Sequence, residues 1–148
     1  MTLHFRNLSI DPDTPVSEWP TEALQTALER GDLDDWRRIG RELSRDPWGR
    51  TARQLEEVLT HSRPYGVAEI MESLLDRARG DAEAAERAQV ADEVRRAVAG
   101  SGLSNAEFAS YIGTSSSRLS TYLNGKVIPS ATLMVRMRRV ADRQRKAA

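Results

Sequence analysis

The segment from Leu103 to Lys126, LSNAEFASYIGTSSSRLSTYLNGK, constrains the fold of this chain more than any other part of it. Two short helical stretches flank Gly113, a residue that reaches the left-handed backbone conformation without the steric penalty of a Cβ. Ala109 is small enough for a second helix to approach closely. Larger side chains recur at helical spacing and are expected to share one core: Phe108, Ile112, Leu119 and Tyr122. The segment therefore predicts two helices joined by a tight turn, an arrangement that commonly presents its second helix to a groove of DNA.

The order of residue types in this segment also resembles the lambda-repressor-like (Xre/Cro) helix-turn-helix family. That family commonly opens with a leucine, two polar residues, alanine or glutamate, glutamate, an apolar residue and alanine, and Leu103 to Ala109 fit this pattern. An apolar–glycine step follows at Ile112-Gly113, and the second helix ends in Asn124-Gly125-Lys126. Pro129-Ser130 fit the start of the family's next helix. The resemblance implies a DNA-binding domain in this part of the chain.

The resemblance covers about Gln89 to Arg143, roughly a third of the chain, and does not extend into residues 1–80. It places Ser116, Ser117 and Thr121 at the groove-lining positions of the second helix. We expect Ser115 to cap that helix and Asn105 to cap or open the first one, beside a phosphate. Arg118 lies beside the groove face, where it can reach a phosphate or a guanine edge, and Lys126 can neutralise a phosphate. The predicted DNA-binding residues are Asn105, Ser115, Ser116, Ser117, Arg118, Ser120, Thr121, Asn124 and Lys126.

The second helix of the motif, which is expected to contact DNA, has few side chains that can distinguish one base from another. Side chains that bond a base through two atoms, such as Gln, Asn and Arg, are each worth about 1–3 kcal/mol of discrimination, but most groove positions lack them. Serine and threonine can bond several bases. Specificity then comes either from Arg118 together with DNA shape, or from a dimer with cooperative partners. Alternatively, the short hydroxyls only let the helix sit deep in the groove.

Charge is distributed unevenly along the chain, although its formal net charge is zero. From Val94 onward there are ten basic and two acidic residues, a net charge of +8. Residues 1–93 hold twelve basic and twenty acidic residues, a net charge of −8. Because neutralisation of phosphates is the main sequence-independent source of DNA affinity, the basic charge coincides with the segment that is expected to bind DNA.

The apolar pattern before this segment predicts a small bundle of about four helices. We expect the first helix to be capped by Ser17 or Thr21, and the second to start at Asp32 or Asp34. A third helix follows from Thr51, and a fourth runs from about Val67 to Arg79 with Ile70, Met71, Leu74 and Leu75 facing inward. The tryptophans are expected to anchor this core, although one of them could instead anchor a partner: Trp19, Trp36 and Trp48.

The chain is therefore expected to be all-α with two domains. Residues 1–80 would form a small helical bundle of unassigned interaction or dimerisation role, with an extended arm or short strand over the first sixteen residues. Residues 81–148 would form the helix-turn-helix DNA-binding domain. Gly80-Asp81 either begins a new helix or marks a joint, and Arg87 to Ala99 would be the first helix of the DNA-binding domain.

Several other classes of protein are disfavoured by composition. The chain has no cysteine, its N-terminus does not resemble a signal peptide, and no apolar run approaches the ~20 residues that span a bilayer, so a cytoplasmic protein without membrane contact is expected. His4 and His61 are isolated, and the acid pairs Asp34-Asp35 and Glu56-Glu57 point ~100° apart on a helix. We therefore expect no enzyme activity, no catalytic residue, no metal and no cofactor.

Two functions are favoured for the whole chain, and a purely structural adaptor is a third possibility that is favoured only if the basic face does not bind DNA. One is a transcription regulator, expected to be a repressor, that binds an inverted-repeat operator as a homodimer, because a two-fold pair doubles the contacts of one module. The other is an antitoxin of a toxin–antitoxin operon, whose acidic N-terminal domain binds a partner protein while the helix-turn-helix autoregulates. Antitoxins often use an extended segment for this task, whereas residues 17–79 are predicted to fold, and this favours the regulator.

Overall fold

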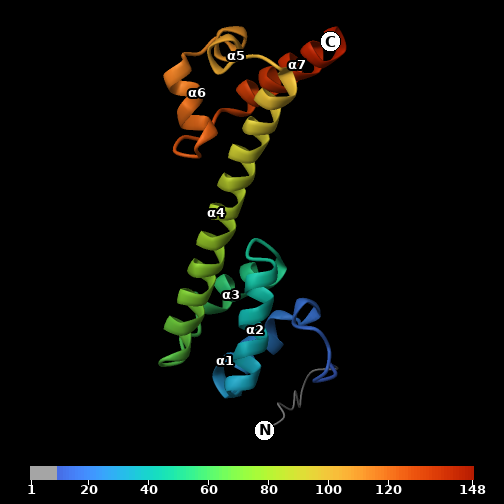
Figure 1. Cartoon of the computed structure of the whole chain (residues 1–148). Coiled ribbons are helices and arrows are strands. Elements are labelled where there is room, and N and C mark those ends of the chain that lie inside the picture. The colour runs from blue at the N-terminus through green and yellow to red at the C-terminus, as the bar shows by residue number, and fades with distance from the viewer. Residues whose placement is uncertain (1–9) are drawn as a thin grey trace. The chain divides into compact units, whose positions relative to one another are not determined.

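A computed structural model describes residues 10–148, and this part of the chain is helical throughout, without strands (Figure 1). The expected all-α fold is thereby confirmed for these residues. The elements are the 3-10 helix η1 (Val16–Glu18) and the α-helices α1 (Thr21–Arg30), α2 (Leu33–Arg45), α3 (Arg50–Leu59), α4 (Val67–Ser101), α5 (Asn105–Ile112), α6 (Ser116–Leu123) and α7 (Ala131–Ala147).

The extended arm that was expected over the first sixteen residues falls largely outside the described residues. Residues 11–14 form a turn, which is closed by a 2.9 Å hydrogen bond from the Thr14 N–H to the Asp11 carbonyl oxygen. The 3-10 helix η1 follows directly. Residues 11–18 are therefore not an extended strand.

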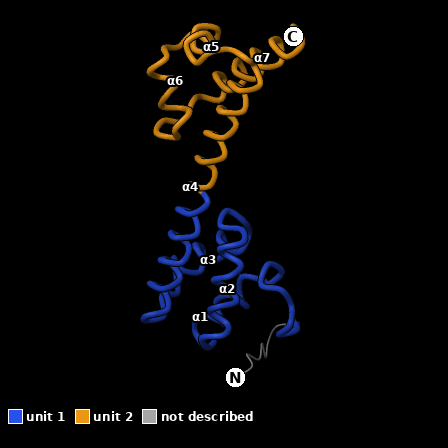
Figure 2. The backbone as a smooth tube through the Cα atoms, viewed as in Figure 1, with its two compact units in different colours: residues 1–82 blue, residues 83–148 orange. Residues whose placement is uncertain are grey.

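The chain divides into two compact units, residues 1–82 and 83–148 (Figure 2). Helix α4 supplies residues to both, because it continues without a break from Val67 to Ser101. The expectation of separate helices from Val67 to Arg79 and from Arg87 to Ala99 was wrong. Gly80 costs about 1 kcal/mol in a helix interior, but the alanines and glutamates around it favour the helix. Within residues 10–148, no helix has the length and apolar character that crossing a bilayer requires.

The core of the N-terminal unit is built around Trp19, which is completely buried. Its indole N–H donates to the Thr14 carbonyl oxygen at 2.9 Å, and the Arg38 guanidinium lies 5.1 Å from the ring centroid. Large side chains from α1 to α4 complete this core: Leu24, Leu28, Ile39, Leu43, Leu55, Val58 and Met71. Trp19 is thus the anchor that was expected, whereas Trp36 is partly buried and Trp48 is 49% exposed.

Two local expectations in this unit were wrong. Neither Ser17 nor Thr21 caps α1, because Pro20 occupies the N-cap position and holds the preceding Trp19 in an extended conformation. Ile70 does not face inward and is 51% exposed. The buried residues of this part of α4 recur at helical spacing, and Ile70 lies at the edge of the face that they form: Val67, Ala68, Met71, Leu75 and Ala78.

The second unit has a separate core that joins the C-terminal part of α4 to α5, α6 and α7. The four side chains that were predicted to share a core do so: Phe108, Ile112, Leu119 and Tyr122 are all buried in one cluster. Val94 and Val98 of α4 and Met134, Met137 and Val140 of α7 close this cluster. Burial of one face of α5 and α6 leaves their opposite faces to solvent.

Candidate nucleic-acid interface

Helix α5 begins with a capping box formed by Ser104 and Glu107. The Ser104 hydroxyl oxygen accepts a hydrogen bond from the Glu107 N–H at 3.2 Å, and the Glu107 carboxylate accepts one from the Ser104 N–H at 3.3 Å. Asn105 is therefore the first residue of the helix and not its cap, and its side chain is exposed. The Ser-x-x-Glu spacing is a sequence signal for this box, and it could have located the cap.

The turn between α5 and α6 depends on Gly113, whose φ is 78°. The Gly113 N–H bonds to carbonyl oxygens at the end of α5, and the Thr114 N–H reaches the Ala109 carbonyl oxygen at 2.9 Å. Ala109 is buried in the same cluster as Leu119 and Tyr122 of the following helix. The chain changes direction sharply within a few residues because residue 113 has no Cβ and residue 109 has only a methyl group.

We expect Gly113→Ala to lower the free energy of unfolding of the C-terminal unit by roughly 1–2 kcal/mol, through strain in the left-handed backbone. A Cβ at this position would meet only the Arg136 Nη1 atom, at 3.8 Å, so crowding adds little. Urea unfolding followed by circular dichroism measures the change. The matched control is Gly100→Ala in the last turn of α4, where a Cβ meets no atom within 4 Å, and it should not lower the free energy. Equal losses in both variants would contradict the role of the Gly113 conformation.

Helix α6 presents a row of small polar side chains. Ser115 caps it as predicted, and its hydroxyl accepts a hydrogen bond from the Arg118 N–H at 3.1 Å. Leu119 and Tyr122 are buried, whereas Ser116, Ser117, Arg118 and Ser120 are exposed. Thr121 is half-buried, and its hydroxyl donates to the Arg118 carbonyl oxygen at 2.6 Å, so only its lone pairs stay available to a ligand.

The end of α6 is shaped by Asn124 and Gly125. Asn124 occupies the C-cap, and its Oδ1 atom accepts a hydrogen bond from the Lys126 N–H at 3.1 Å. Gly125 has a φ of 76°, a conformation that brings the chain sharply away from the helix. Lys126 is exposed after this turn, and its ammonium group makes no ion pair within residues 10–148. The Arg118 guanidinium likewise has no ion pair in the described chain.

Two of the ten basic residues from Val94 onward bond to the helices of the motif. Arg95 of α4 donates from Nη1 to the Leu123 carbonyl oxygen at 2.6 Å, at the C-terminal end of α6. Arg136 of α7 donates from Nη1 to the Ile112 carbonyl oxygen at 3.3 Å, at the end of α5. Both satisfy carbonyls that have no partner within their own helix, and both place positive charge at the negative end of a helix dipole. Sequence spacing gives no sign of either contact.

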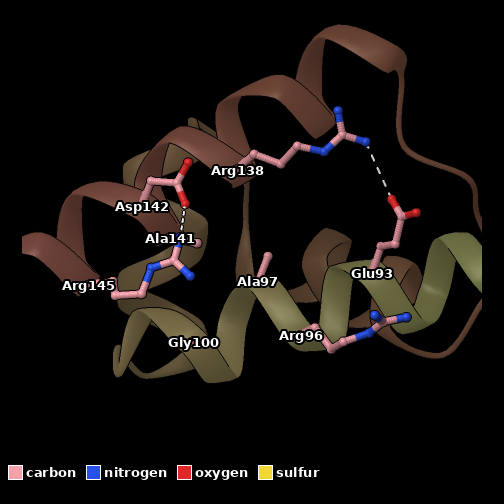
Figure 3. Close-up of a pocket in the computed structure, with 8 residues that line it drawn as sticks. All are labelled: Glu93, Arg96, Ala97, Gly100, Arg138, Ala141, Asp142 and Arg145. Carbon is pink, nitrogen blue, oxygen red and sulfur yellow. Dashed lines mark hydrogen bonds and ion pairs between the residues drawn. The ribbon is translucent and has the colours of Figure 1, made fainter.

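Three other arginines of this unit are paired with acids. A hollow between α4 and α7 is lined by Arg96, Arg138 and Arg145 together with Glu93 and Asp142 (Figure 3). Arg138 contacts Glu93 at 3.4 Å, Arg145 contacts Asp142, and Arg96 contacts Asp92 beside the hollow. Residues 83–148 hold eleven basic and six acidic residues, a net charge of +5. In and directly after α6, the basic residues without an ion pair are Arg118, within the helix, and Lys126, three residues after its end.

A family model described as helix-turn-helix matches residues 94–143. This span contains α5, α6, the turn at Gly113 and most of α7. The C-terminal unit therefore contains a helix-turn-helix domain of the lambda-repressor-like (Xre) type. Such a domain indicates a DNA-binding transcriptional regulator, and its family is typically without enzyme activity. No curated protein and no solved structure matched the chain.

Proposed function

We propose that this protein regulates transcription, as a repressor, by inserting α6 into the major groove of an inverted-repeat operator that it binds as a homodimer. The exposed row of Ser116, Ser117 and Ser120 carries this proposal, because these side chains lie on a helix that is buried on its other face. Small hydroxyl side chains allow close approach to base edges. Thr121 completes the proposed base-contact surface through its lone pairs.

The other proposed contacts are to phosphate. Ser115 at the start of α6 retains a hydroxyl proton that can be donated to a phosphate oxygen, and Asn105 lies at the start of α5, where backbone N–H groups favour an anion. Arg118 and Lys126 supply unpaired positive charge, and the Asn124 amide N–H₂ group can donate beside Lys126. Because base readout by these residues is weak, a two-fold pair of modules is needed for a specific site.

Selection of bound fragments from sheared genomic DNA near physiological salt tests this proposal. We expect enrichment of a short inverted repeat whose half-sites are about one helical turn apart, roughly 34–36 Å, or a multiple of that distance. A repeat upstream of the protein's own gene would support autoregulation, and a toxin-like neighbouring gene would favour the antitoxin function. Unselective binding that disappears at modest salt would overturn the proposal of sequence-specific regulation.

We expect Lys126→Ala to weaken binding by a similar factor on all DNA sequences. It should also reduce the slope of log affinity against log salt concentration by about one unit, because one phosphate contact is lost. Fluorescence anisotropy with specific and unrelated duplexes over a range of salt measures both effects. Lys146→Ala is a suitable control, since Lys146 is the other lysine of the chain and lies at the end of α7. A loss confined to one DNA sequence would show that Lys126 contacts a base.

A further inference from the structure

An apolar groove lies between α2 and α4 in the N-terminal unit, and DNA binding through α6 does not use it. It has a volume of about 480 Å³, and its apolar lining consists of Leu33 and Trp36 of α2 and Ile70 and Leu74 of α4. Leu33 is 56% and Ile70 is 51% exposed, so large apolar side chains meet solvent along the groove. These apolar side chains gather in one groove and are not scattered singly over the surface, which favours a site of interaction.

The shape of the groove suits a helix. Its lining on α2 extends from Leu33 to Ser44, roughly 16 Å at 1.5 Å per residue, which is about three helical turns. Gly40 lets Leu74 of α4 pack closely against α2, since a Cβ at residue 40 would lie only 3.3 Å from the Leu74 Cδ1 atom. The Trp36 indole N–H already donates to the Ala27 carbonyl oxygen at 2.9 Å. An occupant therefore need not satisfy this donor.

The margins of the groove are basic, although residues 1–82 hold eleven basic and sixteen acidic residues. Arg37 and Arg41 line the α2 side, one helical turn apart. On α4, exposed Arg77 follows Leu74 by three residues and Ile70 by seven, on the same side of the helix. Arg37 has only an exposed contact with Asp34 at 3.6 Å, and neither Arg41 nor Arg77 has an ion pair within residues 10–148.

We infer that this groove binds an amphipathic helix from a different protein, with an apolar stripe bordered by aspartate or glutamate. Apolar anchors at helical spacing would fill the space between Leu33 and Ile70, and carboxylates would meet the three arginines. A second copy of the chain is a poor occupant, because pairing groove to groove would bring like-charged arginines together. The proposed partner helix is acidic, whereas the net negative charge of the N-terminal half alone would favour a basic partner.

The test is a displayed library of 16-residue peptides in an alanine-rich helical frame, with apolar and charged positions randomised. It is selected on the full chain and counter-selected on Ile70→Arg, a change at a half-exposed position. We expect sequences with apolar residues at i, i+4 and i+7 and acidic residues beside them. One selected peptide is then titrated against the Arg37→Glu, Arg41→Glu double variant. Its affinity should fall at least tenfold.

The matched control is the Arg30→Glu, Arg53→Glu double variant, which makes the same charge change at exposed positions on α1 and α3. It should leave the affinity nearly unchanged, with circular dichroism confirming that both double variants are folded. Equal losses in both variants, or selection of basic or no peptides, would overturn the inference. So would concentration-dependent self-association that is abolished by Ile70→Arg, because it would assign the groove to a second copy. Binding of laurate in the groove with no selected peptide would assign it to an apolar anion.

Discussion

Ser117→Glu is expected to abolish specific DNA binding while leaving the protein folded. Ser117 is exposed in the first turn of α6, so a longer side chain is tolerated in the free protein. In the proposed complex, the glutamate would meet the negative surface of the groove, and a like-charge contact of this kind costs several kcal/mol. Because about 1.4 kcal/mol corresponds to a tenfold change, affinity should fall at least a hundredfold. Titration of the operator by fluorescence anisotropy measures the loss.

Two variants separate charge from position in this experiment. Ser117→Ala removes only the hydroxyl and should retain most of the affinity. Ser73→Glu makes the same change at an exposed helical position in the N-terminal unit, and it should bind DNA like the unmodified protein. If folded Ser117→Glu kept its operator affinity, α6 would not be the helix that enters the groove.

Trp19→Ala is expected to lower the free energy of unfolding of the N-terminal unit by about 3–5 kcal/mol. The substitution empties the centre of the core, where Trp19 is completely buried. It also removes the indole donor from the Thr14 carbonyl oxygen and the ring beneath the Arg38 guanidinium. Urea unfolding monitored by the fluorescence of Trp36 and Trp48 reports on this unit, since all three tryptophans of the chain lie within it.

Trp48→Ala makes the same substitution at a tryptophan that is half exposed, and its effect on stability is compared with that of Trp19→Ala. Trp48 is 49% exposed, and the Arg79 guanidinium lies 4.8 Å from its ring centroid. Its removal should cost about 1 kcal/mol, as for an exposed ring with one cation contact. Similar losses in the two variants would show that Trp19 does not anchor the core.

The helix-turn-helix could be predicted from sequence because its determinants are local. Gly113 sets the turn, Ser115 caps α6, and Phe108 and Leu119 lie on faces that helical spacing alone defines. The contacts of Arg95 and Arg136 could not be predicted, since their partners lie 28 and 24 residues away. An arginine that bonds a distant carbonyl has the same sequence signature as one that meets solvent.

The N-terminal unit was less predictable, because packing among its helices decides which apolar residues are buried. Ile70 and Met71 are adjacent and both apolar, yet Met71 is completely buried and Ile70 is half exposed. The helix period allows both to face a wide apolar stripe, and only the packing of α4 against the other helices of the unit distinguishes them. The α2–α4 groove arises from this difference and therefore could not be predicted from the apolar pattern.

The contacts of Arg95 and Arg136 bear on how related sequences should be compared. The guanidinium is planar and directs several donors, whereas a lysine ammonium is a compact charge on a flexible stem. An exchange of arginine for lysine at either position preserves formal charge but changes the partner of a helix-terminal carbonyl. An alignment score that treats the two residues as equivalent would therefore group chains whose α5 and α6 are held differently. Arginine at both positions is a marker of shared domain geometry, which a count of basic residues does not capture.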